Sequence, residues 1–336
     1  MVLNKSVVIS KLLPALFITN YLSVTSEVLG VGRKPNELGA VTYELIGRFG
    51  DNLLSYMHAK WLSLYYARKG YNLPVLYKPF LFSNQLRVHD IEKGCSRERL
   101  TSLHRIISLK NHKWTDLESN SHVLYEIPYF PYDLEKEPGN WTAFPVDWKD
   151  PEFKRELKRV VHPRFALPKF ELLADKITVA IHVRRGGSFE ELNLGFPFKF
   201  PDDSYYVEQL GVLDRLLGHR PLYVFIFTDD REPLKILADF QKRFEQFSHI
   251  TFDCRRTKTD HNLNVLEDFF ALTKFDCLIR PDSNFSVCAA KISDYLVEIE
   301  PKKCYVEDHK AIISEVNIVI DEELCKKRDI LLQKLT

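Results

Sequence analysis

The order of apolar and polar positions becomes regular from residue 177, where short apolar runs alternate with amphipathic segments. β-Branched and aromatic runs predict strands at Ile177–Val183, Leu222–Phe227, Ile250–Asp253 and Cys277–Arg280. Apolar residues at helical spacing predict helices near Tyr205–Leu217, Glu232–Phe247, Leu263–Thr273 and Phe285–Val297. Four successive strand–helix units with right-handed connections predict a doubly wound α/β domain built on a parallel sheet.

The pattern before residue 177 is similar but less regular. A strand at Ala40–Ile46 and a helix at Asp51–Arg68 begin it, whereas residues 119–168 are rich in aromatics, prolines and charges and suit a linker or a cleft-lining region. We therefore expect two Rossmann-like domains facing each other across a cleft. Their predicted bounds are 34–168 and 169–336, after a leader at 1–33.

The leader allows three interpretations. Residues 7–24 are largely apolar but are interrupted by Lys11 and Pro14, so they could form a weak signal peptide, a poor membrane anchor, or an opening strand and helix. A targeting or membrane-associated role is slightly favoured. If the leader is a targeting signal, the protein is expected at a membrane or in the secretory pathway. If it is not, the protein is expected in the cytoplasm.

The composition limits the classes of partner that the protein is expected to bind. The 336 residues are 45% hydrophobic, and 47 basic against 46 acidic residues give a net charge of +1, without the basic excess of a nucleic-acid binder. Small molecules or glycans are the expected partners. The six cysteines form no CxxC pair, and no cluster of His, Asp and Cys shows ligand spacing, so we expect no metal and no cofactor.

The most informative segment is Thr178–Gly187, which reads TVAIHVRRGG. It predicts a buried strand whose end delivers His182, Arg184 and Arg185 to the carboxyl edge of the sheet, where open α/β sheets bind ligands. Each guanidinium group is planar and can bind two oxygens of a phosphate at once, and Gly186 lets the backbone approach that phosphate closely. A diphosphate is the expected ligand. The alternative is a surface arginine pair that merely closes a strand.

Polar groups also stand at three other strand ends. The loop GRFGDN places backbone amides at a helix start, which suits an anion or a sugar hydroxyl, although a tight turn with Asp51 as N-cap explains it equally well. The strand FIFTDD ends in Asp229 and Asp230, which could cap the next helix or face the ligand. The loop residues proposed as functional are Gly47, Arg48, Gly50, Asp51 and Asn52.

The last strand end gives the strongest of these signals. Serine, asparagine and a helix dipole in RPDSNFS would hold a phosphate, and Asp268 lies on the helix before that strand. Simple helix capping is the alternative. The residues proposed here are Asp268, Ser283, Asn284, Phe285 and Ser286.

Taken in order, these blocks resemble the α-1,2-fucosyltransferases and, more distantly, the α-1,6- and protein O-fucosyltransferases. GRFGDNLLSYMHAKW resembles the family's G-R-L-G-N-Q block, AIHVRRGG its H-x-R-R-G-D motif, and FIFTDD its F-S-D-D strand end. The most specific likeness is EDFFALTKFDCLIRPDSNFSVCAAKIS, which matches the family's last block without a gap. The blocks span residues from about 40 to 295.

The resemblance implies a GT-B fold, GDP-fucose as donor, inversion at the anomeric carbon, and no required metal. By that likeness Arg184 would hold the β-phosphate, His182 and Arg185 would shape the diphosphate pocket, and Asp268 would accept hydrogen bonds from guanine. Ser283–Ser286 would bind phosphate oxygens, and the GRFGDN loop would belong to the acceptor side. The implied activity is transfer of fucose to a glycan hydroxyl, most simply an α-1,2 linkage to galactose.

Three departures from the family pattern leave other functions open. Gly187 stands where the family has Asp, Asp51 and Asn52 replace Asn and Gln, and Val287–Cys288 replace a tryptophan pair. Glu190 or Glu191 could supply a general base instead, although exposed loop glutamates are the simpler interpretation. The alternatives are a catalytically silent GDP-sugar- or glycan-binding protein, and a transferase for another nucleotide sugar.

Overall fold

The computed structural model describes residues 8–10, 36–92, 103–110, 112–128, 146–173, 175–186, 197–260, 262–330 and 332–333. The chain divides into two compact units. The larger contains Met1–Leu12 and Leu167–Thr336, and the smaller contains Leu13–Ala166. Each unit carries its own parallel strands, so the predicted α/β class is confirmed.

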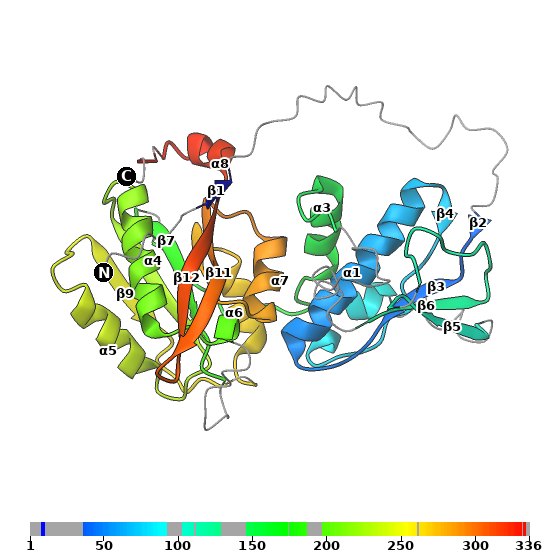
Figure 1. Cartoon of the computed structure of the whole chain (residues 1–336), viewed down its shortest axis with the longest axis horizontal. Helices are drawn as coiled ribbons and strands as arrows, with labels where there is room; N and C mark the ends of the chain where they lie inside the picture. Colours follow the sequence, from blue (N-terminus) through cyan, green and yellow to red (C-terminus); the bar gives the residue numbers. More distant parts are fainter. Residues whose placement is uncertain are drawn as a thin grey trace. The chain divides into compact units, whose positions relative to one another are not determined.

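A seven-stranded sheet forms the centre of the larger unit, in the order β1-β12-β11-β10-β7-β8-β9 (Figure 1). Five neighbouring strands, from β11 to β9, run parallel, whereas β12 is antiparallel to β11 and parallel to β1. The strands are β1 (Val8–Ser10), β7 (Ile177–Val183), β8 (Leu222–Thr228), β9 (Ile250–Cys254), β10 (Cys277–Ile279), β11 (Val297–Glu307) and β12 (Lys310–Ile320).

Helices cover both faces of this sheet, which is why β7 is buried at all seven positions. On one face Val179 and Ile181 pack with apolar residues of α4 and α5. The other face carries Phe225 and Phe227, whose rings contact that of Phe275 in the segment between α6 and β10. The helices are α4 (Asp203–Leu216), α5 (Pro233–Arg243), α6 (Val265–Leu272), α7 (Asn284–Ile292) and α8 (Glu322–Lys327), with a 3-10 turn η3 (Pro197–Lys199).

The predicted helix near Phe285–Val297 is wrong at its end. Helix α7 ends at Ile292, and Val297 begins β11, the first strand of a long hairpin with β12. The hairpin turns at Asp308 and His309, both with positive φ (48° and 58°), as a tight two-residue connection requires.

The smaller unit has a three-stranded parallel sheet in the order β3-β6-β5 and a two-stranded pair β2-β4. Helix α1 packs on β3, and α3 packs on α1. The elements are β2 (Asn36–Glu37), β3 (Ala40–Tyr43), α1 (Phe49–Arg68), β4 (Tyr71–Asn72), η1 (Ser83–Gln85), β5 (Arg105–Ser108), β6 (Val123–Ile127) and α3 (Pro151–Val160).

Of the predicted leader, only Val8–Ser10 lies within the described residues, and there it forms β1 beside β12. The remainder of residues 1–33 falls outside them. Among the helices of the described ranges, none has both the length and the apolar character to cross a membrane.

Candidate functional site

The order of the strands marks one point on the large sheet. From β7 the chain proceeds to β8 and β9 on one side and then returns to β10 on the other side of β7. In open α/β sheets, ligands bind outside the carboxyl ends of the strands at such a topological switch point. The ends of β7 and β10 carry His182, Arg184 and the start of α7, so these predicted site residues come together here.

A hydrogen bond joins the end of β7 to helix α7. Nδ1 of His182 lies 2.9 Å from Oγ of Ser286, and both residues are buried. The Ser286 hydroxyl also lies 3.1 Å from the carbonyl oxygen of Ser283, to which it can donate. If it does so, a neutral His182 donates from Nδ1 and keeps Nε2 as an acceptor.

Burial controls the charge of His182. Desolvation, with the nearby charges of Arg184 and Arg280, lowers its pKa from 6.5 to about 3. The ring is therefore neutral at physiological pH. It can orient Ser286 but adds no positive charge for a phosphate.

Both arginines of the pair are held by carboxylates. Nη1 of Arg184 lies 2.6 Å from Oδ2 of Asp229, whose Oδ1 accepts a 2.6 Å hydrogen bond from the backbone N–H of Arg185. The Arg185 side chain pairs with Asp203 at the start of α4 and lies 4.0 Å from Asp230. Asp229 thus fixes the strand exit. Within the described residues the Arg184 guanidinium makes this one ion pair, so its N–H groups can still bind a ligand oxygen.

Gly186 follows with a φ of +84°, a left-handed conformation that side chains rarely adopt. Gly187, Glu190 and Glu191 lie outside the described residues, so the base proposed among these glutamates has no described position.

Asp268 lies on α6 and already has a cationic partner. Arg255, just after β9, donates from Nε (3.1 Å) and Nη2 to Oδ1 of Asp268, and its Nη1 lies 3.2 Å from Glu267. Burial raises the pKa of Asp268 to about 6, although Arg255 opposes the shift. Because both bonds from Arg255 end on Oδ1, Oδ2 is the oxygen best placed to accept from a ligand.

The start of α7 combines capping with aromatic contacts. Ser283 is the N-cap, and its side chain makes no capping hydrogen bond. The ring of Phe285 lies 5.5 Å from that of His182 and 5.6 Å from that of Phe269. Ser286 is fully buried, so its hydroxyl holds His182 and is not exposed for a phosphate. Ser283 and Asn284 keep small exposed fractions of 7% and 5%.

Sequence reasoning missed a third arginine at this edge. Arg280 directly follows β10, and 3% of its side chain is exposed. It pairs with Glu298 at 2.7 Å and with Glu300, and its carbonyl accepts a hydrogen bond from Tyr205. Its partners alternate along β11 at positions i and i+2. The spacing of the two glutamates is present in the sequence, but it places both side chains on one face only if 297–307 forms a strand.

The GRFGDN loop belongs to the smaller unit and forms the start of α1. The N-cap is Arg48, so the prediction of Asp51 as N-cap is wrong. Asp51 is the third helical residue, and its carboxylate accepts a 2.8 Å hydrogen bond from the Arg48 N–H. Asn52 donates to the Arg48 carbonyl (3.1 Å), and Gly50 is buried. The loop geometry is thus that of a capped strand-to-helix turn.

One group of possible metal ligands does exist, against the sequence expectation. Asp214, His219 and His249 each offer an atom within 4.8 Å of the others. This group has no recognisable ligand spacing in the sequence, because His249 lies 30 residues beyond His219. All three lie before β8 or β9, at the amino edge of the sheet, away from the arginine pair.

Neither a family model nor a curated protein matches this chain. Among solved structures, an arginine-to-lysine mutant of Arabidopsis thaliana FUT1 in complex with GDP is 11% identical, with a TM-score of 0.44 over 81% of this chain and 72% of that one. NodZ α-1,6-fucosyltransferase soaked with GDP-fucose is 14% identical, with a TM-score of 0.41 over 84% and 99%. Escherichia coli heptosyltransferase WaaC with ADP-2-deoxy-2-fluoro heptose is 12% identical, with a TM-score of 0.31 over 80% and 91%. Similarity at this level assigns no function to this chain.

Proposed function

We propose that this chain is a glycosyltransferase of the GT-B type, which binds GDP-fucose at the carboxyl edge of its large sheet and transfers fucose to a glycan hydroxyl. The observation that supports it best is the hydrogen bond between His182 and Ser286. These residues belong to two motif blocks 104 positions apart, and the bond brings both blocks to the topological switch point. A chance likeness of short motifs would not require that convergence.

Within this proposal the arginines replace a metal ion. As the bond between fucose and GDP breaks, negative charge grows on the β-phosphate, and donors aimed at that charge lower the barrier. Arg184 is the proposed hydrogen-bond donor because it directly follows β7 and its guanidinium makes only one ion pair within the described residues. Arg185, Gly186 and the amides at the start of α7 complete the proposed phosphate contacts, and Oδ2 of Asp268 is proposed to accept from guanine.

The acceptor side of the proposal rests on the sequence resemblance. It favours a galactose-terminated glycan and an α-1,2 linkage, with the smaller unit and its GRFGDN loop on the acceptor side and Glu190 or Glu191 as general base. Membrane association through residues 7–24 likewise stays a prediction.

A second candidate is a protein that binds a GDP-sugar without transferring it. The observation that favours it is the pairing of Arg184 with Asp229 and of Arg185 with Asp203, because a phosphate must compete with both carboxylates. In that case the arginines would mainly hold the strand end.

Two measurements separate these candidates. Incubation with labelled GDP-fucose and a panel of galactosides should give labelled product if the chain is a transferase, whereas the binding protein would retain GDP without product. Competition among GDP, UDP and ADP tests the donor. GDP should bind most tightly, and a preference for UDP would contradict the proposal.

A further inference from the structure

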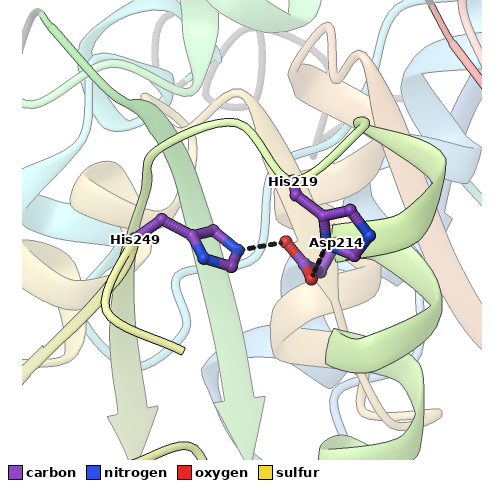
Figure 2. A group of neighbouring side chains, drawn as sticks. All are labelled: Asp214, His219 and His249. Carbon is purple, nitrogen blue, oxygen red and sulfur yellow. Dashed lines mark hydrogen bonds and ion pairs between the residues drawn. The ribbon is translucent and has the colours of Figure 1, made fainter. Parts of the chain in front are cut away.

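A buried carboxylate at the amino edge of the large sheet lies between two histidines (Figure 2). Asp214 belongs to the last turn of α4, His219 follows that helix, and His249 immediately precedes β9. Oδ2 of Asp214 lies 2.6 Å from Nδ1 of His219, and Oδ1 lies 2.7 Å from Nε2 of His249. The cluster therefore joins the α4–β8 turn to the α5–β9 turn.

A nearby cation would stabilise the carboxylate of Asp214 at this position. Its side chain is only 3% exposed, and it lies in the C-terminal turn of a helix, where the dipole favours positive charge and disfavours a carboxylate. A buried carboxylate is stable only when it is paired or coordinates a metal. Here its two nearest side-chain partners are imidazoles, which are themselves metal ligands when neutral.

We propose that Asp214, His219 and His249 form a binding site for a divalent transition metal ion, with Zn²⁺ as the preferred ion. Two imidazole nitrogens and one carboxylate oxygen are a ligand set that zinc accepts in tetrahedral geometry. The side chain of His219 is 58% exposed, so solvent can supply the fourth ligand.

Zinc binding requires the three side chains to adjust. Tetrahedral zinc with ligands at about 2.0–2.1 Å places those ligands about 3.3 Å apart. The two oxygen–nitrogen pairs must therefore separate by about half an ångström, whereas ligand atoms that lie up to 4.8 Å apart must approach one another. Each ring proton must move to the other ring nitrogen or to water. His219 is held in a left-handed conformation (φ 57°) just beyond the helix end, which fixes its backbone beside Asp214.

The role of this site would be structural and not catalytic, because it lies at the edge of the sheet opposite Arg184 and cannot reach the GDP-fucose proposed to bind there. Metal bound to the folded chain should raise its melting temperature by mass action. With zinc at about a hundred times its Kd, we expect a rise of about 5–10 °C for a unit of this size.

The test is titration of the untagged, chelator-treated full chain with ZnCl₂, by calorimetry and by thermal melting. His249→Gln keeps a donor to Asp214 but loses the imidazole, and His219→Asn suits a left-handed backbone. Each should weaken zinc binding about tenfold or more. The matched control is His309→Asn, which replaces another exposed histidine with positive φ (58°).

The expected result is one zinc per chain, bound equally by the parent and by His309→Asn and weakly by the other two variants. Absence of zinc binding by the folded parent would overturn the proposal and leave a purely hydrogen-bonded cluster. Binding of equal strength in all four proteins would overturn it as well, because the metal would then be held elsewhere.

Discussion

At the scale of single residues, His182 shows how burial decides what a side chain can contribute. Its ring lies among β7, α7 and two arginines, and it is neutral because a charge there would be desolvated and repelled. The sequence motif alone would allow His182 to bind a phosphate as a positively charged side chain. Its neutrality excludes that role near neutral pH. Its hydrogen bond positions Ser286.

This neutrality predicts how stability depends on pH. The pKa of His182 falls from 6.5 in the unfolded chain to about 3 in the folded chain, so the unfolded chain binds the proton first. The contribution of His182 is present above pH 6.5 and is lost as the pH falls towards 3, by up to about 1.4 kcal/mol per pH unit. Chemical denaturation between pH 7 and 4 should show a smaller loss for His182→Asn than for the parent.

The exposed-site variant His309→Asn is the control for this measurement. It should lose stability with acid as the parent does. If His182→Asn and the parent lose the same free energy of unfolding between pH 7 and 4, the histidine is not buried in its neutral form.

Asp268 makes the opposite case, a carboxyl whose pKa is raised. With a pKa of about 6, it becomes neutral as the pH falls below 6 and can no longer accept two N–H groups of guanine. GDP affinity should therefore fall by up to about tenfold per pH unit below 6. Because the phosphates of GDP also titrate, the quantity to measure is the difference between the parent and Asp268→Asn, by calorimetry at pH 5 to 8.

The variant should bind GDP more weakly than the parent at pH 8, and the two affinities should converge at pH 5. Parallel curves for the two proteins would show that Asp268 serves only to hold Arg255.

At the scale of elements, the start of α1 illustrates a turn that requires glycine. Gly47 has a φ of +79°, and a Cβ there would lie 2.4 Å from Oδ2 of Asp51, the oxygen that accepts from the Arg48 N–H. An alanine would strain the backbone and also displace the capping carboxylate.

Gly70 provides a matched comparison, because its φ is +80° but its Cβ position is open. Gly70→Ala should cost about 1–2 kcal/mol of unfolding free energy for the backbone alone. Gly47→Ala should cost about 1 kcal/mol more, for the lost capping bond. Urea denaturation measures both, and equal losses would contradict this account of the turn.

Four parallel strands of the large sheet, β7, β8, β9 and β10, could be predicted because each is a short buried run followed by an amphipathic helix. The β11–β12 hairpin was missed, although Val297–Glu300 alternates buried and half-buried positions and the turn at Asp308 and His309 is short. Strand β11 resembles a loop in the sequence because five of its eleven residues are charged and it contains Pro301. The pairings of Arg255 with Asp268 and of Arg280 with Glu298 likewise depend on tertiary contacts that no local pattern contains.

At the scale of the whole molecule, two groups of charged residues occupy opposite edges of one sheet. The arginines lie at the carboxyl edge and the histidine–aspartate cluster at the amino edge. Since the arginines are proposed to neutralise the diphosphate, fucose transfer should survive excess chelator, even if zinc stabilises the fold. Transfer assays with and without EDTA, at a temperature well below the melting point, check this. Complete loss restored by Mg²⁺ or Mn²⁺ would indicate Asp229 and Asp230 as metal ligands.

The central claim is tested most directly by the kinetics of transfer from GDP-fucose by the parent, Arg184→Ala and Arg184→Lys. Arg184 is proposed to bind a phosphate whose charge grows in the transition state, so its loss should lower turnover more than donor affinity. We predict a fall on the order of a hundredfold for alanine and partial recovery for lysine, which lacks the planar fork. Arg243→Ala, which removes an exposed arginine of α5 paired with Asp239, should change nothing. A folded Arg184→Ala protein, verified by circular dichroism, with the parent's turnover would contradict the account.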